Sequence, residues 1–193
     1  MELCNGIWGL GADDGFMPNK KLMMKGIEIK NLLVQQTAYN FWANDRIAKF
    51  VADRPDLIGK LTNSSFDTIE KTIHHIWDAE LIWFGRLQGK ALPWPPSAHL
   101  FPNAGIVDFV NTSKEWARLL ENAEAFFLDG ATAYRDSKGI TYETANTGIV
   151  MHCMTHSAYH RGQLITQLHQ LGVREELPNT DLIGFLRSNP NSE

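Results

Sequence analysis

The sequence predicts an all-α protein: a four-helix bundle with a small β-hairpin insertion before the last long helix. Apolar residues recur at three- and four-residue steps through four long segments, which is the period of an amphipathic helix. Glycine and proline clusters separate these segments, and one short stretch has the composition of two β-strands. At 193 residues, 44% of them hydrophobic, the chain can bury a core as one domain without disulfides.

The first two helices are separated by a proline and a glycine. Helical periodicity begins near residue 27 and continues to about residue 51, and Arg54-Pro55 ends it. The second helix is predicted from Ser65, as its N-cap, to about Leu87. A proline-rich loop then runs through Pro102, and we predict that it is not helical.

The third predicted helix covers residues 105–128, and a hairpin follows it. The stretch ATAYRDSKGITYET predicts strands at 131–135 and 140–142, joined around Gly139.

The fourth predicted helix covers residues 147–170, with Gly172 as its C-cap. A last short helix is predicted over 180–187, capped by Asn179 or Thr180.

The first 24 residues differ from the rest of the chain. They contain four glycines but neither a basic segment nor a sustained apolar run, so they do not resemble a secretory signal. Met23 or Met24 could be the biological start. We therefore predict a leader or flexible arm over residues 1–24 and a single domain over residues 25–193.

Charge and cysteine usage exclude several classes of partner. The net charge of -4, with no basic cluster, argues against binding to nucleic acid. No apolar run approaches the length of a membrane span, so no membrane partner is expected. The two cysteines, Cys4 and Cys153, form no disulfide framework, which suits the cytoplasm. We predict that Cys153 is a core residue.

Three histidines in the fourth predicted helix are the most informative feature of the chain. His152, His156 and His160 are spaced four residues apart, and each step of four turns the side chain by only about 40° around the helix. Imidazoles one helical turn apart can bind a single metal ion. His169 falls on the opposite side of the helix, where we expect it to be exposed.

A third metal ligand has to come from another helix, and the second helix contains His74 and His75. His75 shares its side of the helix with Ala79 and Ile82, an inward-facing set, so we choose His75. His75, His156 and His160 then supply three ligands without His152. We therefore expect His152 to support the ligands or to lie in the core, and not to bind the metal itself.

Two polar residues are candidates for orienting the ligands, since metal-bound imidazoles usually donate their other N–H group to an oxygen acceptor. Gln163 lies near His160, and Asp78 follows His75 by three residues. The alternative is that no metal binds and the histidines form a polar seam, hydrogen-bonded to one another and to Gln163.

Several kinds of catalytic site are excluded by their motifs. Ser157, rather than a glutamate, follows His156, so the metalloprotease pattern HExxH is absent. The Glu-x-x-His pattern of di-iron proteins is absent too. The chain contains no P-loop, no dinucleotide-binding glycine motif and no serine nucleophile elbow.

Three stretches of the sequence resemble the DinB family. They are HIWDAE at 75–80, GIVMHCMTHSAYHRGQL at 148–164 and PNTDLIGFLR at 178–187. The resemblance covers roughly residues 27–187. It implies a bundle of four helices, often a homodimer, with a divalent metal bound by three histidines, at the positions of His75, His156 and His160. Some relatives are thiol-dependent S-transferases or isomerases, and others are described as hydrolases.

Three neutral imidazoles leave coordination positions open, which is typical of catalytic rather than structural sites. Our first hypothesis is a transferase that uses a low-molecular-weight thiol on a small electrophile. The alternatives are a hydrolase using metal-bound hydroxide and a non-enzymatic dimeric metal-binding scaffold. His152 is the best candidate for a catalytic acid or base, whereas Tyr159 is expected to pack between helices. The ligands suit zinc or nickel first, and also iron or manganese.

Overall fold

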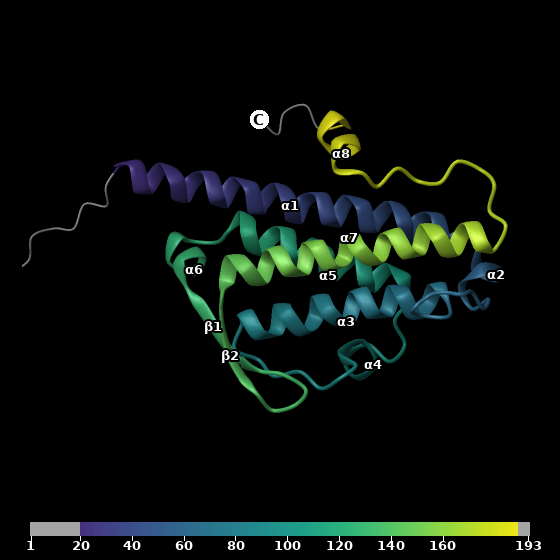
Figure 1. Ribbon diagram of the computed structural model, residues 1–193, viewed down its shortest axis with the longest axis horizontal. Helices are drawn as coiled ribbons and strands as arrows, with labels where there is room; N and C mark the ends of the chain where they lie inside the picture. Colours follow the sequence, from purple (N-terminus) through teal and green to yellow (C-terminus); the bar gives the residue numbers. More distant parts are fainter. Residues whose placement is uncertain (1–19, 189–193) are drawn as a thin grey trace, which may run out of the picture.

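The computed structural model describes residues 20–188, and that part of the chain contains eight helices and one two-stranded antiparallel sheet (Figure 1). The predicted helical class and the predicted hairpin are therefore confirmed. Residues 1–19, most of the predicted leader, lie outside the described residues. The four longest helices are α1 (Lys20–Ala52), α3 (Ile69–Leu87), α5 (Ile106–Glu121) and α7 (Asn146–Gln170).

The four long helices pack against one another around a shared interior. Helix α1 contacts α5 and α7, and α3 contacts the same two helices (Figure 1). Helices α3 and α7 run antiparallel: Thr72, early in α3, is hydrogen-bonded to Gln167, late in α7, whereas Trp83 lies against His152. This antiparallel pair places the middle of α3 opposite the middle of α7.

The apolar interior is divided into two clusters, and α7 contributes to both. Leu164 and Leu168 belong to the first cluster, whereas Ile149 and Cys153 belong to the second. The stretch of α7 between them carries the histidines predicted to bind metal. Large fully buried side chains of the first cluster include Ile47, Ile69, Ile73, Ile76, Trp77 and Phe109, and those of the second include Leu33, Trp116 and Leu120.

The starts of the first two long helices differ from prediction. Helix α1 begins at Lys20, seven residues before the predicted start near residue 27. Helix α3 is capped not by Ser65 but by Thr68, whose side-chain oxygen accepts the N–H of Lys71. Thr68 has an extended backbone, as an N-cap requires, so the chain enters the helix three residues later than predicted.

The third long helix is interrupted where one continuous helix was predicted over 105–128. Helix α5 ends at Glu121, and a separate short helix α6 (Ala125–Asp129) follows. The side-chain amide of Asn122 donates to the carbonyl of Arg118, 2.8 Å away. Such side-chain bonds to the backbone compete with helix continuation.

Two short helices occupy segments that were not expected to be helical: α2 (Pro55–Ile58) and α4 (Pro96–Leu100). The second lies inside the proline-rich loop, so the prediction that this loop is not helical was wrong. Both helices begin with a proline at the first helical position, where the missing N–H costs nothing and the fixed φ angle favours a helical turn.

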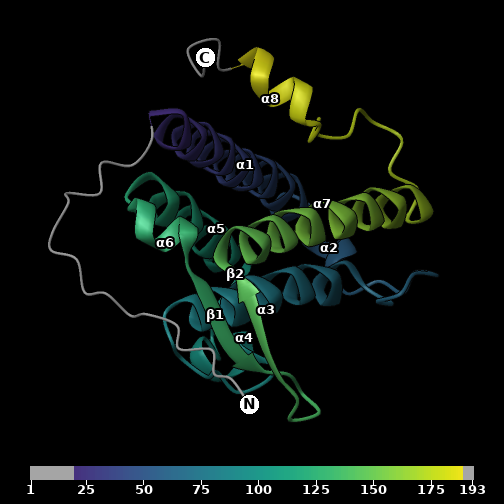
Figure 2. The ribbon, with the colours of Figure 1, turned by 60° about the vertical axis from the view of Figure 1, so that its left-hand side comes forward.

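The hairpin consists of β1 (Ala131–Arg135) and β2 (Thr141–Ala145), so the second strand begins one residue later and ends three residues later than predicted. Asp136 stabilises the turn, because its Oδ1 atom accepts the N–H groups of Lys138 and Ile140. Strand β2 continues directly into α7, and β1 contacts α3, so the hairpin lies beside one end of the α3–α7 pair (Figure 2).

The chain ends in a short helix, α8 (Leu182–Ser188), which contacts α1. This helix begins two residues later than predicted, so neither Asn179 nor Thr180 is its N-cap, and Asn179 instead accepts the N–H of Asp181 through its side-chain oxygen at 2.8 Å. Gly172 follows the end of α7 with a positive φ of 87°, as predicted for the residue that ends this helix. Among residues 20–188, no helix has both the length and the apolar character needed to cross a membrane.

Candidate metal centre

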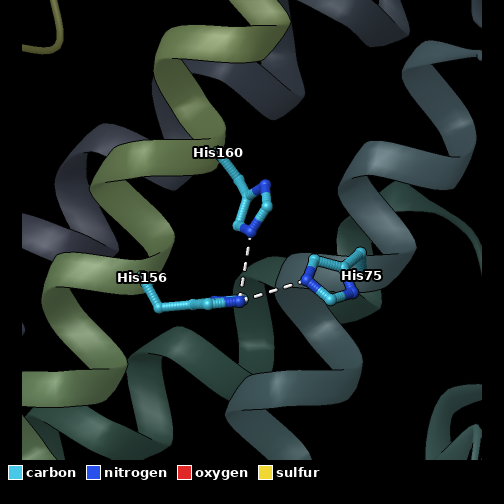
Figure 3. A group of neighbouring side chains, drawn as sticks. All are labelled: His75, His156 and His160. Carbon is cyan, nitrogen blue, oxygen red and sulfur yellow. Dashed lines mark hydrogen bonds between the residues drawn. The ribbon is translucent and has the colours of Figure 1, made fainter. Parts of the chain in front are cut away.

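Three histidines from two helices converge on one point (Figure 3). His75 comes from the middle of α3, and His156 and His160 from consecutive turns of α7. The Nε2 atom of His156 lies 3.1 Å from Nε2 of His75 and also 3.1 Å from Nε2 of His160. The ligand atoms that the three side chains offer all lie within 4.8 Å of one another.

These distances fit a single metal ion. Zinc binds imidazole nitrogen at about 2.0–2.1 Å, so two such nitrogens on one ion are separated by roughly 2.9 Å at a right angle and 3.4 Å at the tetrahedral angle. The two N···N distances of 3.1 Å fall inside this range. The third pair, His75 and His160, lies within 4.8 Å, so adjustment of the side chains can bring all three nitrogens to one ion.

The partner of His160 determines which of its nitrogens faces the cluster. Nδ1 of His160 lies 2.8 Å from Oε1 of Gln163, and an amide oxygen can only accept a hydrogen bond. The proton of neutral His160 is therefore on Nδ1, and the lone pair on Nε2 points toward His156. The predicted contact between Gln163 and His160 is confirmed, whereas a role of Gln163 in orienting a metal ligand stays a prediction.

In the polar-seam alternative, both Nε2···Nε2 contacts of His156 would have to be hydrogen bonds, but the three neutral imidazoles cannot place a proton in each contact. Because Nε2 of neutral His160 carries no proton, a bond to His156 needs the proton of His156. That proton cannot also make a linear bond to Nε2 of His75. Nδ1 of His156 is buried with no hydrogen-bond partner among residues 20–188, and this holds for the seam and for a metal site alike. A cation at the centre removes the conflict between the Nε2 atoms, so the geometry favours a metal site over the seam.

The environment keeps the imidazoles of His75 and His156 neutral. Burial, followed by repulsion from His160, His75 and His152, lowers the pKa of His156 from 6.5 to about 4. Burial and the neighbouring His160 also lower the pKa of His75. At neutral pH both side chains therefore offer lone pairs, which is the form a metal ion requires.

An aromatic residue covers one side of the cluster. The ring of Phe66 lies 4.4 Å from the ring of His75 and 5.7 Å from that of His160, measured between centroids. Glutamine side chains of α7 hold the segment before α3 in place: Gln167 donates to the carbonyl of Phe66 at 2.8 Å, and Gln170 contacts Asn63. The segment before α3 is thus fastened to the helix that carries two of the three histidines.

Two exposed aromatic side chains also lie near the cluster. His160 is buried and His75 and His156 are half-buried, but Tyr159 is 65% exposed and lies 4.9 Å from the ring of His160. The prediction that Tyr159 packs between helices was therefore wrong. Trp94, 59% exposed, has its ring 6.5 Å from that of His75.

His152 lies beside the three-histidine cluster, not in it. Its ring is exposed, 5.9 Å from that of His156, and it contacts the edge of Trp83 at 5.1 Å. Burial of part of the ring, and then the charge of Arg86, lower the pKa of His152. A neutral imidazole at this position can accept a proton, but a catalytic role of His152 remains a prediction.

The neighbour of His75 and its predicted orienting group face elsewhere. Nδ1 of His74 lies 3.2 Å from the hydroxyl oxygen of Ser97. Oδ1 of Asp78 accepts the backbone N–H of Ser97 at 2.7 Å, so it anchors the start of α4. Asp78 raises the pKa of His75 through its charge, without a hydrogen bond to it. The prediction that Asp78 orients His75 by a hydrogen bond was therefore wrong.

A buried polar network behind the cluster was missed by the sequence analysis. Glu80 is fully buried and accepts hydrogen bonds from Asn40, Asn44, Ser113 and Ser157. Burial raises the pKa of Glu80, while these donors oppose the rise.

Arg161 completes this network from α7. It is 2% exposed and donates to the side-chain oxygens of Asn40 and Asn44 at 2.6 and 2.8 Å. The only signal in the sequence was the presence of charged residues, Glu80 and Arg161, in otherwise inward-facing stretches of helix. Ser157 and Arg161 directly follow His156 and His160, so the network fixes the stretch of α7 that carries both.

Two further predictions about α7 are confirmed. Cys153 is buried with no exposed surface, and burial raises the pKa of its thiol well above 9.0, so it is a core residue. His169 is exposed, as its position on the helix predicted. Cavities of about 460 Å³, beside His169, and about 340 Å³, beside His74, lie away from the three-histidine cluster.

Comparison with known proteins agrees with the motifs. No curated protein matches the sequence significantly. A family model, that of the DinB family, matches residues 17–193. The match begins ten residues before the resemblance predicted near residue 27, and therefore includes part of the predicted leader. Because it covers nearly the whole chain, the protein belongs to the DinB family.

Proposed function

We propose that this protein binds one divalent metal ion through His75, His156 and His160 and is a metal-dependent transferase that uses a low-molecular-weight thiol on a small electrophile. The observation that carries the proposal is the convergence of three Nε2 atoms, at metal-compatible distances, from a rigid pair of helices. Within residues 20–188, the cluster contains no fourth protein ligand. We interpret the four long helices as the four-helix bundle that holds the site.

The chemistry of the proposal follows from the open coordination. When bound, such an ion is a Lewis acid that lowers the pKa of a coordinated thiol or water. The chain holds the ion with neutral ligands, since the lowered pKa values of His75 and His156 keep both unprotonated at neutral pH. Gln163 fixes the ring of His160 through Nδ1. Phe66 shields one side of the cluster from water.

His152 is the residue we propose for proton transfer. It lies on the exposed side of the cluster, and its lowered pKa leaves it able to accept a proton at neutral pH. It would take the thiol proton as the sulfur binds, and return a proton to the leaving group. The edge contact with Trp83 limits the orientations that this ring can adopt.

We also propose that the active form is a homodimer in the cytoplasm. Helix α1 exposes Ile27, Ile29 and Leu32, apolar side chains that a second copy of the chain could cover. Cys153, a free buried thiol, is compatible with a reducing compartment. Light scattering coupled to size-exclusion chromatography tests the dimer: a monomer mass would contradict it.

The deciding experiment combines metal content with two assays. Untagged protein and the His75→Ala and His160→Ala variants are analysed for metal after reconstitution with zinc, nickel, iron or manganese. Each is then assayed for thiol transfer, with glutathione and monochlorobimane, and for ester hydrolysis, with p-nitrophenyl acetate. About one ion per chain and metal-dependent thiol transfer, both lost in the variants, support the proposal. Hydrolysis alone indicates a hydrolase, and bound metal without turnover indicates a scaffold.

A further inference from the structure

A charged residue at the end of α3 has most of its hydrogen-bonding capacity unused. Arg86, in the last turn of α3, has its guanidinium carbon 4.3 Å from the ring centroid of Trp83 and 4.4 Å from that of Tyr134. Contacts of this kind hold a planar cation in one orientation. The side chain therefore connects the end of α3 to the hairpin with its position fixed.

Arg86 has no carboxylate partner. Among residues 20–188 its one hydrogen bond runs from Nη2 to the backbone carbonyl of Arg135, 3.1 Å away, and it forms no salt bridge. Five N–H groups are available to a guanidinium, so most are left for another acceptor. The charge of Asp136 acts on Arg86, but the Oδ1 atom of Asp136 accepts backbone N–H groups in the turn of the hairpin. A half-buried cation without a counter-ion is a favourable place for an anion.

A continuous series of contacts joins Arg86 to the metal centre. The Trp83 ring that contacts Arg86 also touches His152, 5.1 Å between centroids, and His152 lies 5.9 Å from His156. The charge of Arg86 acts on His152, whose pKa it helps to lower. His152 is exposed, and Trp83, Arg86 and Tyr134 are half-buried, so a ligand can reach this series from solvent.

We propose that Arg86 binds a carboxylate of the small thiol whose sulfur reaches the metal, an inference that rests on the proposed function. Carboxylate is the anion that matches the fork of a fixed guanidinium with two parallel hydrogen bonds. His75 and Arg86 are eleven residues apart on one side of α3, which is about 16 Å along the helix axis. The length of the Arg86 side chain shortens this span, so the ligand is a carboxylate-bearing thiol of roughly tripeptide size.

Arg86 could instead serve only to anchor the hairpin, and an experiment separates the two roles. Glutathione and its diethyl ester are the probes: both carry the thiol, and only glutathione carries free carboxylates. Isothermal titration calorimetry measures their dissociation constants on the zinc-loaded protein. The variants are Arg86→Gln and Arg86→Lys. Lys138→Gln, which removes an exposed cation from the same hairpin, is the matched control.

We expect the wild-type protein to bind glutathione about tenfold to a hundredfold more tightly than the diester, the range for hydrogen bonds to charged groups. Arg86→Gln should bring the ratio close to one without changing metal content or the affinity for the diester. Arg86→Lys should restore part of the preference, and Lys138→Gln should keep it. The inference is overturned if Arg86→Gln leaves the ratio of the two dissociation constants unchanged. It is also overturned if the wild-type protein binds glutathione and the diester equally tightly, or does not bind glutathione.

A second readout keeps this inference separate from the proposed function. In cobalt-substituted protein, sulfur coordination adds a thiolate-to-metal absorption band. If that band appears with both probes but Arg86→Gln does not alter the ratio, the thiol proposal stands and the Arg86 inference falls. If Arg86→Gln removes the preference for glutathione over the diester but neither probe gives the absorption band, carboxylate binding by Arg86 is supported. The proposal that a thiol binds the metal is then contradicted.

Discussion

Oε1 of Gln163 accepts a hydrogen bond from Nδ1 of His160, 2.8 Å away and less than one helical turn earlier on α7. This contact leaves the lone pair of Nε2 directed toward the cluster, because a neutral imidazole carries one proton. In the proposed metal site, Gln163 would therefore act through His160 and not by touching the ion.

Removing the Gln163 amide should weaken metal binding without abolishing it. We expect Gln163→Met to lower zinc affinity by about 10- to 100-fold, the usual effect of losing a residue that orients a ligand. Competition with a chromophoric chelator measures this. Gln170→Met is the matched control, because Gln170 also bonds the segment before α3 but contacts no histidine. Equal losses in both variants would mean that the segment, not the tautomer of His160, controls affinity.

Removing one of the proposed metal ligands should abolish metal binding without unfolding the protein. In His156→Ala we expect metal content to fall from about one ion per chain to almost none, while circular dichroism keeps most of its helical signal, because two apolar clusters carry the core. His169→Ala should keep its metal, since His169 is exposed on another side of α7. Loss of the helical signal in His156→Ala would show instead that the metal is structural.

The buried network makes a prediction about stability. Glu80→Ala removes the acceptor of several buried donors and leaves the buried Arg161 cation uncompensated, so we expect unfolding free energy to fall by about 3 to 5 kcal/mol. Urea denaturation measures the change. The control is Glu115→Ala, which breaks an exposed pair with Arg118 and should cost at most about 1 kcal/mol. If the two substitutions lowered the free energy of unfolding by similar amounts, the buried network would not be an important source of stability.

The metal-free protein should lose stability as the solution is acidified. Unfolding returns His156 to a pKa near 6.5, whereas the folded protein holds it at about 4, so the unfolded chain binds more protons between these values. The free energy of unfolding therefore falls as pH decreases from about 6.5 to 4. His156→Gln should show a shallower dependence in chelator-treated samples. Parallel curves for the two proteins would contradict the lowered pKa.

The sequence was sufficient for the features that depend on one helix. The three-residue and four-residue periodicity predicted the long helices, and the helical wheel selected His75 over His74 and placed His169 outside. Gln163 could be predicted because its contact with His160 is local. These relationships are fixed by helical geometry, which does not depend on the rest of the chain.

Features that depend on packing between distant segments could not be predicted. Glu80 is a buried acceptor only because α1, α5 and α7 bring polar side chains to it. Asp78 was expected beside His75 but bonds to Ser97, and that partner depends on the path of the proline-rich loop. Tyr159 looked like a packing residue and is exposed, since no segment within residues 20–188 covers its side chain.

The three histidines belong to two helices whose nearest ligands are 81 positions apart in the chain. Their convergence requires that α3 and α7 keep their relative position to within a fraction of an ångström. Metal affinity is then a sensitive reporter of core packing, and a substitution such as Leu164→Ala, which touches no ligand, can be detected as altered coordination. If the proposed ion binding is what selection maintains, the same selection also maintains the interior that aligns the two helices.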